Sequence, residues 1–151
     1  LTPYGVPLII NDRVDVALAA DADGVHVGQS DMPYEMVKRL LPEGKIIGLS
    51  VESPEQVLEA NDYDLDYVAA SPVFSTTTKT NTIVEWGLDG LRWIRSVSRH
   101  PLVAIGGIHS NNVASIFKAG ADSVAVISAI VSADDPERAA RELLEKSGEP
   151  H

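Results

Sequence analysis

The chain has no cysteine among its 151 residues. Disulfide bonds, thiolate metal sites and cysteine nucleophiles are therefore excluded. Basic residues are scarce beside acidic ones, with 12 Lys and Arg against 22 Asp and Glu and a formal net charge of -10. Because the average field of such a chain repels polyanions, we expect neither nucleic acid nor an anionic membrane as a partner. A phosphate site would have to be local, built from backbone N–H groups, one or two lysines and a divalent cation.

Long apolar segments are missing as well. No run of about 18 apolar residues predicts a membrane span, and no charged segment followed by an apolar one predicts a secretory signal. The expected location is therefore cytoplasmic. The hydrophobic content of 44% is enough for one domain with a substantial core.

Short runs rich in Val, Ile and Leu alternate with helical patterns, which is typical of parallel strands joined by crossover helices. The predicted strands are Pro7–Ile10, Gly24–Val27, Lys45–Leu49, Tyr67–Ala70, Leu102–Ile105 and Ser123–Val126. Their continuous apolar character predicts that both faces are covered. The fold class is α/β, a TIM-type (β/α)8 barrel of which about six βα units are present. We expect residues 1–151 to form a single barrel domain that lacks its N-terminal βα units, with Leu1–Val6 as the tail of a preceding helix-strand connection.

Start signals precede several predicted helices. They are Asp31 before Pro33, Ser53 before Pro54, and Ser110 before residues 111–118. A C-terminal helix is predicted at Pro136–Lys146, with Ala139, Leu143 and Leu144 on one apolar stripe.

Polar residues follow the first three strands, where parallel α/β folds bind their ligands. Asn11 and Asp12 end the first strand, and Asp31 follows the second. Two carboxylates at neighbouring strand ends suit a hard cation such as Mg²⁺, although each Asp also precedes a helix and could be a cap. The Ser50 hydroxyl after the third strand could meet a phosphate or start the next helix.

Three later segments offer groups for binding anions. The irregular stretch Ser71–Gly87 contains Ser75-Thr76-Thr77-Thr78-Lys79, which is either a set of donors or a solvated loop. Gly106–Gly107 follows the fifth strand, and a short helix predicted to begin near Ser128 follows the sixth. Together they match the phosphate site of the last two barrel loops, while a tight turn and a helix cap are the alternatives.

The motifs N-D, H-V-G-Q-S-D, T-x-T-K, G-G-I and V-I-S-A-I occur in this order between about Pro7 and Lys146. In combination they resemble the thiamin phosphate synthase family. The resemblance implies a transferase of thiamin biosynthesis that joins hydroxymethylpyrimidine diphosphate to thiazole phosphate, releasing pyrophosphate. It also implies a dissociative mechanism, in which the pyrimidine carbon–oxygen bond ionises before the thiazole nitrogen attacks.

The same resemblance assigns roles to residues of this chain. Asp12 and Asp31 would hold Mg²⁺. Lys79 and Ser50 would be catalytic and, with Asn11, would contact the pyrophosphate or pyrimidine side. The thiazole phosphate would be bound by Thr76, Thr78, Gly107, Ile127 and Ser128. The implied partners are phosphorylated small molecules. The resemblance leaves open whether the chain forms a homo-oligomer.

Two departures from the family pattern keep alternatives open. The family begins with further βα units that include a Q-x-R-x-K stretch, and nothing here corresponds to them. Glu52 stands where many relatives have His, and the similar thiazole tautomerases use a His there, so a tautomerase remains an alternative. A non-catalytic phosphate-binding barrel is another. An isomerase or aldolase-like barrel would need a base on an inner strand position, and the strands offer only Lys45, at a strand start.

We expect His26 to satisfy a buried hydrogen bond or to orient Asp31, and Trp86 and Trp93 to be packing residues.

Overall fold

The computed structural model describes residues 1–75 and 85–148. Within them the elements are η1 (Thr2–Tyr4), β1 (Ile9–Asn11), α1 (Val14–Ala19), β2 (Gly24–Val27), α2 (Tyr34–Leu40), β3 (Ile46–Val51), α3 (Pro54–Ala60), β4 (Tyr67–Ala70), α4 (Gly87–Val97), β5 (Leu102–Ile105), α5 (Val113–Lys118), β6 (Ser123–Ala125), α6 (Ser128–Val131) and α7 (Pro136–Ser147).

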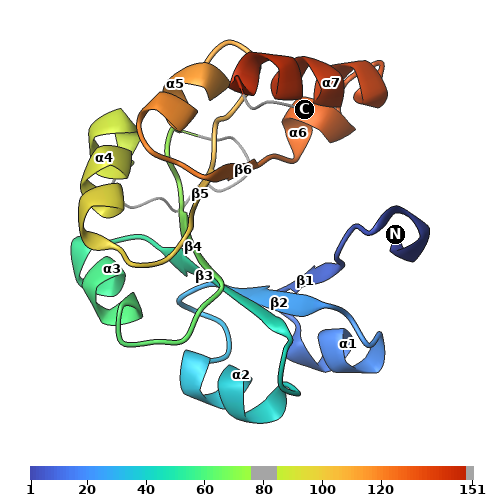
Figure 1. Ribbon diagram of the computed structural model, residues 1–151, viewed down its shortest axis with the longest axis vertical. Coiled ribbons are helices and arrows are strands. Elements are labelled where there is room, and N and C mark those ends of the chain that lie inside the picture. The colour runs from blue at the N-terminus through green and yellow to red at the C-terminus, as the bar shows by residue number, and fades with distance from the viewer. Residues whose placement is uncertain (76–84, 149–151) are drawn as a thin grey trace.

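The six strands form one parallel sheet in the order β1-β2-β3-β4-β5-β6. Figure 1 shows this sheet curling into an open arc, with the helices along its outer side and the N-terminal segment across the opening from α6. The architecture is that of a TIM-type α/β barrel, as predicted, with β1 and β6 as the edges of the described sheet.

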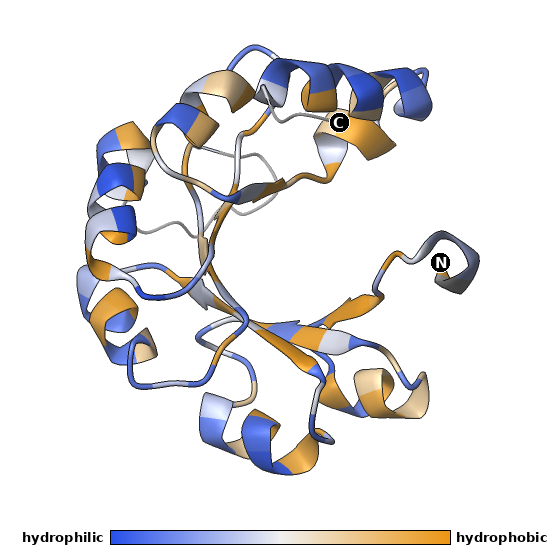
Figure 2. Ribbon diagram, viewed as in Figure 1, coloured by the Kyte–Doolittle hydropathy of each residue, from blue (hydrophilic) through white to orange (hydrophobic). Residues whose placement is uncertain are grey.

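The outer face of the sheet carries the hydrophobic core. Residues paired across parallel strands project to the same side, and the outward rows are apolar. They consist of Val25, Val27, Ile47, Leu49, Val51, Val68, Ala70, Leu102 and Ala104, all buried. Figure 2 shows helices such as α4 banded in hydrophilic and hydrophobic colours, as expected of helices that bury one side. Each fully buried Val or Leu side chain contributes about 1.5–3 kcal/mol to folding.

The inner face is built from smaller and more polar side chains. One row across the sheet consists of Asn11, His26, Gly48 and Tyr67, which are paired strand by strand. A cavity of about 310 Å³ lies on this face. Asn11 is exposed, and so are Ser123 and Ala125 on the edge strand β6. The prediction that both faces are covered is therefore correct for the outer face and wrong for the inner face of the edge strands.

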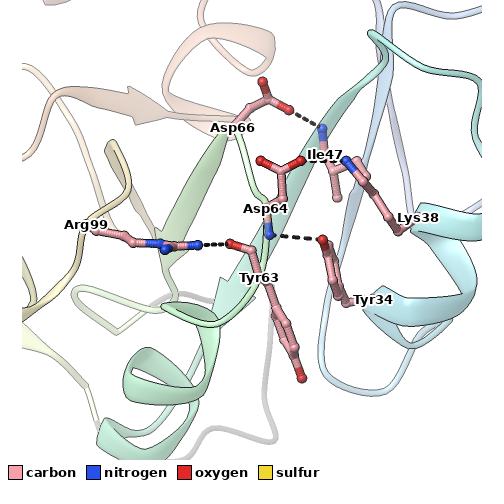
Figure 3. A network of polar contacts seen from close by, with 7 residues as sticks. All are labelled: Tyr34, Lys38, Ile47, Tyr63, Asp64, Asp66 and Arg99. Atoms are coloured by element: carbon pink, nitrogen blue, oxygen red, sulfur yellow. Dashed lines mark hydrogen bonds and ion pairs between the residues drawn. The ribbon is translucent and has the colours of Figure 1, made fainter.

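The amino-terminal edge of the sheet is held by a repeated aspartate contact. Asp23, immediately before β2, accepts the N–H of Leu8 at 2.7 Å. Asp66 before β4 accepts the N–H of Ile47 at 2.8 Å (Figure 3), and Asp122 before β6 accepts that of Leu102 at 2.8 Å. Each aspartate thus satisfies a backbone donor at the start of the neighbouring strand, where the ladder provides no partner.

An ion pair and a hydrogen bond to a tyrosine hydroxyl add to this edge around α2. Lys38 pairs with Asp64 at 2.7 Å, and the Tyr34 hydroxyl accepts the Asp64 N–H at 2.9 Å (Figure 3). The Lys38 ammonium, as hydrogen-bond donor and opposite charge, lowers the pKa of Asp64. Because both side chains are exposed, the pair contributes little to stability.

The predicted strands Gly24–Val27, Tyr67–Ala70 and Leu102–Ile105 occur with the predicted bounds. The third strand runs to Val51, so Ser50 lies inside a strand and not after it. Leu1–Val6, predicted as the tail of a helix-strand connection, contains a 3-10 turn, Thr2–Tyr4.

The predicted helix starts are correct in part. Ser53 caps α3 by accepting the Gln56 N–H. Asp31 and Ser110 do not cap helices, because α2 begins after Pro33 and α5 after Asn112. In α7, Leu143 is buried, whereas Leu144 is 56% exposed and does not belong to the packed stripe. Among the described residues, no helix combines the length and apolar character needed to cross a membrane.

Candidate functional site

All strands are parallel, so their carboxyl ends lie at one edge of the sheet. This edge holds every predicted site residue that the structure describes: Asn11, Asp12, Asp31, Ser50, Gly107, Ile127 and Ser128. Thr76, Thr78 and Lys79 lie outside the described residues. The convergence follows from the topology alone, and the local contacts show what each residue does there.

Asn11 is the last residue of β1 and is paired with His26 of β2. Its side chain lines the 310 Å³ cavity on the inner face. The remaining lining residues come from all strands except β3: Ile9, His26, Tyr67, Val103, Ile105, Ser123, Val124 and Ala125. A ligand in this cavity would therefore meet an amide, an imidazole and a phenol.

Asp12 follows β1 with a left-handed backbone, at a φ of 64°. Few residues other than glycine adopt this conformation, although Asp and Asn tolerate it better than most. Its N–H donates to the His26 carbonyl at 2.8 Å, which extends the β1–β2 pairing by one residue. Asp12 is not the N-cap of α1, because Arg13 occupies that position.

Asp31 closes the turn that follows β2. Its Oδ2 accepts the Gly28 N–H at 2.7 Å, and its own N–H donates to the Gly28 carbonyl at 3.2 Å. A Cβ at Gly28 would lie 3.1 Å from this carboxylate oxygen, so glycine leaves room for the close approach. The turn fixes the carboxylate at the strand end while most of its lone pairs can still accept other groups.

The two aspartates have the chemistry that a magnesium ion requires. Mg²⁺ is bound by one or two carboxylates together with waters and substrate phosphate. Asp12 and Asp31 follow adjacent strands and are exposed and half-buried, respectively. In the described part of the chain no group of three or more His, Asp or Glu side chains forms a fuller metal cage.

Ser50 is buried in β3 and belongs to a polar chain. Its Oγ lies 2.9 Å from His26 Nε2, and His26 Nδ1 lies 3.1 Å from the Tyr67 hydroxyl. The Ser50 carbonyl accepts the Gln29 side-chain N–H at 2.6 Å. The prediction that His26 satisfies a buried hydrogen bond is confirmed, with Ser50 and Tyr67 as its ring partners.

Tyr67 is the site residue that the sequence did not reveal. Its ring stacks on His26 with centroids 5.5 Å apart, although β3 runs between their strands. Gly48 makes this contact possible, since a Cβ there would lie 2.1 Å from the Tyr67 ring. Burial, and then the charge of Asp66, raises the pKa of Tyr67, so the phenol keeps its proton at neutral pH. The sequence signal for Tyr67 is weak. Gly48 is a small residue between the large polar residues His26 and Tyr67, and this arrangement follows from the register of three strands.

Gly106 and Gly107 form a left-handed turn after β5, with φ values of 102° and 63°. A Cβ on Gly107 would lie 2.8 Å from Phe74 Cβ and from the Ser75 carbonyl. The glycine pair therefore lets the segment after β4 pack against the end of β5. Asn112 donates to the Gly107 carbonyl at 2.9 Å and holds the turn from α5.

The predicted short helix after β6 is confirmed as α6, which begins at Ser128. Ile127 precedes it and is 67% exposed. The Ile127 carbonyl accepts the N–H groups of Ile130 and Val131. The first amide groups of such a turn have no partner within the helix, which is the usual setting for an anion.

The described ends of the long β4–α4 connection are held at this edge too. Ser75 donates to the Glu85 carboxylate, and the Trp86 N–H donates to the Pro72 carbonyl at 3.0 Å. Trp86 also donates its indole N–H to Val51 at 3.0 Å and stacks on Trp93, which confirms its packing role. Glu52, next to Val51, donates its N–H to the Gln56 side chain.

Comparison with known proteins gives a consistent result. The family model for thiamine monophosphate synthase matches residues 1–130. A thiamine-phosphate synthase of Albidiferax ferrireducens is 54% identical over 136 residues, covering 90% of this chain and 62% of that protein. One from Vibrio parahaemolyticus is 51% identical over 140 residues, covering 93% of this chain and 69% of that protein.

Solved structures agree with these matches. Thiamine phosphate pyrophosphorylase from Pyrococcus furiosus has a TM-score of 0.87 and 44% identity, covering 97% of this chain and 69% of its own. Orotidine 5'-phosphate decarboxylase from Pyrococcus horikoshii has a TM-score of 0.69 at 21% identity, which reflects the barrel fold alone. The chain spans about 62% of the length of the Albidiferax protein and 69% of that of the Vibrio protein.

Proposed function

Because the chain belongs to the thiamine monophosphate synthase family, we propose that it condenses hydroxymethylpyrimidine diphosphate with thiazole phosphate to give thiamin phosphate and pyrophosphate. The observation that carries the proposal is the gathering of Asn11, Asp12, Asp31 and Ser50 at one strand edge, in a chain about half identical to synthases. The activity is a proposal because the chain spans only part of the length of these synthases, 62% of the Albidiferax protein.

The proposed reaction breaks the bond between the pyrimidine methylene carbon and the diphosphate oxygen. Pyrophosphate leaves with the bonding electrons, and the thiazole nitrogen then forms the new bond to the carbon. Catalysis therefore depends on stabilising the departing anion and on holding both substrates in register. Asn11 and Ser50 serve the pyrimidine side, and Lys79 adds a positive charge for the leaving group.

The thiazole phosphate is assigned to the other end of the edge. Gly107 and the Ile127–Ser128 segment follow β5 and β6, the strands that provide the last two loops of the described sheet. Thr76 and Thr78 complete this part of the proposal. Its physical support is that a glycine turn and the start of α6 present backbone N–H groups.

Asp12 and Asp31 are proposed to hold Mg²⁺. The ion supplies charge neutralisation to the diphosphate when it is bound. The turn of Gly28 orients Asp31, and the left-handed backbone of Asp12 places the second carboxylate directly after β1. The residues themselves provide oxygen ligands and a net negative charge that attracts the cation.

The direct test is product formation. This chain is mixed with both substrates and Mg²⁺, and thiamin phosphate is measured by chromatography. We expect product, and we expect Asp31→Ala and Lys79→Ala to lower kcat/KM by about 10²-fold or more, as for removal of a charged transition-state contact. Exposed Asp62 on the α3–β4 connection and exposed Lys118 on α5 provide matched controls, Asp62→Ala and Lys118→Ala.

Three results would count against the proposal. Absence of product would contradict the synthase activity of this chain. Product that is unaffected by both site substitutions would contradict the site. Isomerisation of the thiazole phosphate without condensation would instead favour a tautomerase with Glu52 as its proton carrier.

A further inference from the structure

The hydrogen bonds of the polar chain Ser50–His26–Tyr67 can run in either of two directions. The direction determines whether the Ser50 hydroxyl can donate to a ligand or only accept from it. Imidazole in its neutral form donates through one nitrogen and accepts through the other. If His26 Nε2 carries the proton, it donates to Ser50 Oγ, and the Ser50 hydroxyl proton is left to point elsewhere. If Nδ1 carries the proton, Ser50 donates to His26 and offers a ligand only lone pairs.

Geometry makes Tyr67 the residue that selects between these two states. Its hydroxyl is 3.1 Å from His26 Nδ1, and its ring is stacked on the imidazole at an interplanar angle of 11°. The ring occupies the space that Gly48 leaves in the row between them. Ser50 is 5% exposed and its carbonyl is held by Gln29, so the far end of the chain is fixed as well.

Acid strength favours one direction. A phenol, with an ordinary pKa near 10, is a stronger donor and a weaker acceptor than an aliphatic hydroxyl. Given one phenol and one serine hydroxyl at the two imidazole nitrogens, the lower-energy arrangement has the phenol donating. Burial raises the pKa of Tyr67, so the phenol still carries at neutral pH the proton that it donates.

We propose that Tyr67 is a positioning residue that donates to His26 Nδ1, holds His26 as the Nε2–H tautomer, and so turns the Ser50 hydroxyl into a donor for the bound pyrimidine substrate. The part that concerns the ligand rests on the proposed function. The tautomer does not, because it is a property of the free protein. Tyr67 lies on β4, the strand next to that of Ser50, and acts on Ser50 through the ring of His26 on β2.

The first experiment measures the tautomer directly. In the chain labelled with ¹⁵N-histidine, long-range ¹H–¹⁵N spectra at pH 8, above the ordinary imidazole pKa of about 6.5, distinguish protonated from unprotonated ring nitrogens. We expect His26 to be protonated at Nε2. His100 is an internal reference, because its Nε2 lies 2.8 Å from the Ala60 carbonyl, which can only accept. Protonation of His26 at Nδ1 in the unsubstituted protein would overturn the proposal, whatever the enzyme does.

The second experiment removes only the phenolic oxygen. Tyr67→Phe should populate the Nδ1–H tautomer of His26 and raise KM for the pyrimidine diphosphate on the order of 3- to 10-fold, the usual value of one hydrogen bond. Little change in kcat is expected. Tyr63→Phe is the matched control, since the Tyr63 hydroxyl donates to Glu59 outside the sheet. An unchanged KM together with an unchanged tautomer would overturn the assigned role of Tyr67.

A double substitution tests whether Tyr67 acts through Ser50. In a Ser50→Ala background, Tyr67→Phe should have no further effect on KM, because the donor that it orients is gone. Additive effects would show a merely structural role and would overturn the proposal. Lack of activity in the unsubstituted chain would instead contradict the proposed function, and the tautomer spectrum would still decide the relay.

Discussion

The contact between Gly48 and Tyr67 leads to a sharp prediction for Gly48→Ala. Gly48 lies in the fully buried middle of β3, and a Cβ there would lie 2.1 Å from Tyr67 Cζ and 2.4 Å from its hydroxyl oxygen. Non-bonded carbon atoms rest at about 3.5–4.0 Å, so the ring must move by roughly 1.5 Å. Such a movement breaks the 3.1 Å hydrogen bond to His26.

Three contributions set the size of the effect. Overpacking of a buried position costs about 1–3 kcal/mol. Loss of the His26 hydrogen bond adds about 0.5–1.5 kcal/mol. Replacing glycine in a strand returns about 0.5–1 kcal/mol of backbone entropy. The net loss of unfolding free energy is about 0.5–4 kcal/mol, and its middle value corresponds to a Tm lower by about 8 °C for a chain of this size.

Urea denaturation of four proteins tests the reasoning: the parent, Gly48→Ala, Tyr67→Ala and the double variant. In the Tyr67→Ala background no ring opposes the new methyl group. Gly48→Ala should there be neutral or stabilising by about 0.5–1 kcal/mol. An equal loss of stability in both backgrounds would refute the argument, since the cost would then not come from the ring.

Three further predictions follow from other contacts. Asp66→Ala removes the acceptor of the Ile47 N–H and should lower the unfolding free energy by about 1 kcal/mol in urea denaturation, whereas Asp62→Ala should not. The raised pKa of Tyr67 means that the folded state holds its proton more tightly than the unfolded state. This stability is fully present below about pH 10 and is lost as pH rises through the folded pKa, so Tyr67→Phe should lose less stability than the parent between pH 8 and pH 11. Gly107→Ala forces an L residue to a φ of 63° and against Ser75, and should raise KM for thiazole phosphate more than KM for the pyrimidine substrate; the opposite preference would contradict the assignment of Gly107.

The fold could be predicted because each βα unit carries its own pattern. Gly24–Val27 and Leu102–Ile105 are short apolar runs between turns, and their bounds need no long-range information. The predicted third strand, Lys45–Leu49, ends too early, because a polar residue such as Ser50 after an apolar run predicts the end of a strand. In three dimensions its hydroxyl is satisfied by His26 from the neighbouring strand, so the strand continues through it.

The sequence predicts only those residues of the candidate site whose location follows from their position at the end of a strand. Every described residue predicted for the site lies at the carboxyl edge, because in a parallel sheet the last residues of the strands and the residues that follow them share one edge. The helix-cap alternatives for Asp12 and Asp31 failed, because α1 and α2 begin at later residues. Tyr67 could not be found in this way, because its role depends on the register of three strands and on a glycine that belongs to the middle one.

The two edges of the sheet carry different polar contacts. At the amino-terminal edge Asp23, Asp66 and Asp122 repeat one contact, in which a carboxylate satisfies a strand N–H. At the carboxyl edge lie the left-handed Asp12 and the buried Ser50, from which a polar chain runs through His26 to Tyr67 at the start of β4. Strained and polar features cost folding free energy and persist where binding or catalysis needs them. Substitutions at the first edge should therefore change stability alone, whereas those at the second should change ligand binding by more than their effect on stability explains.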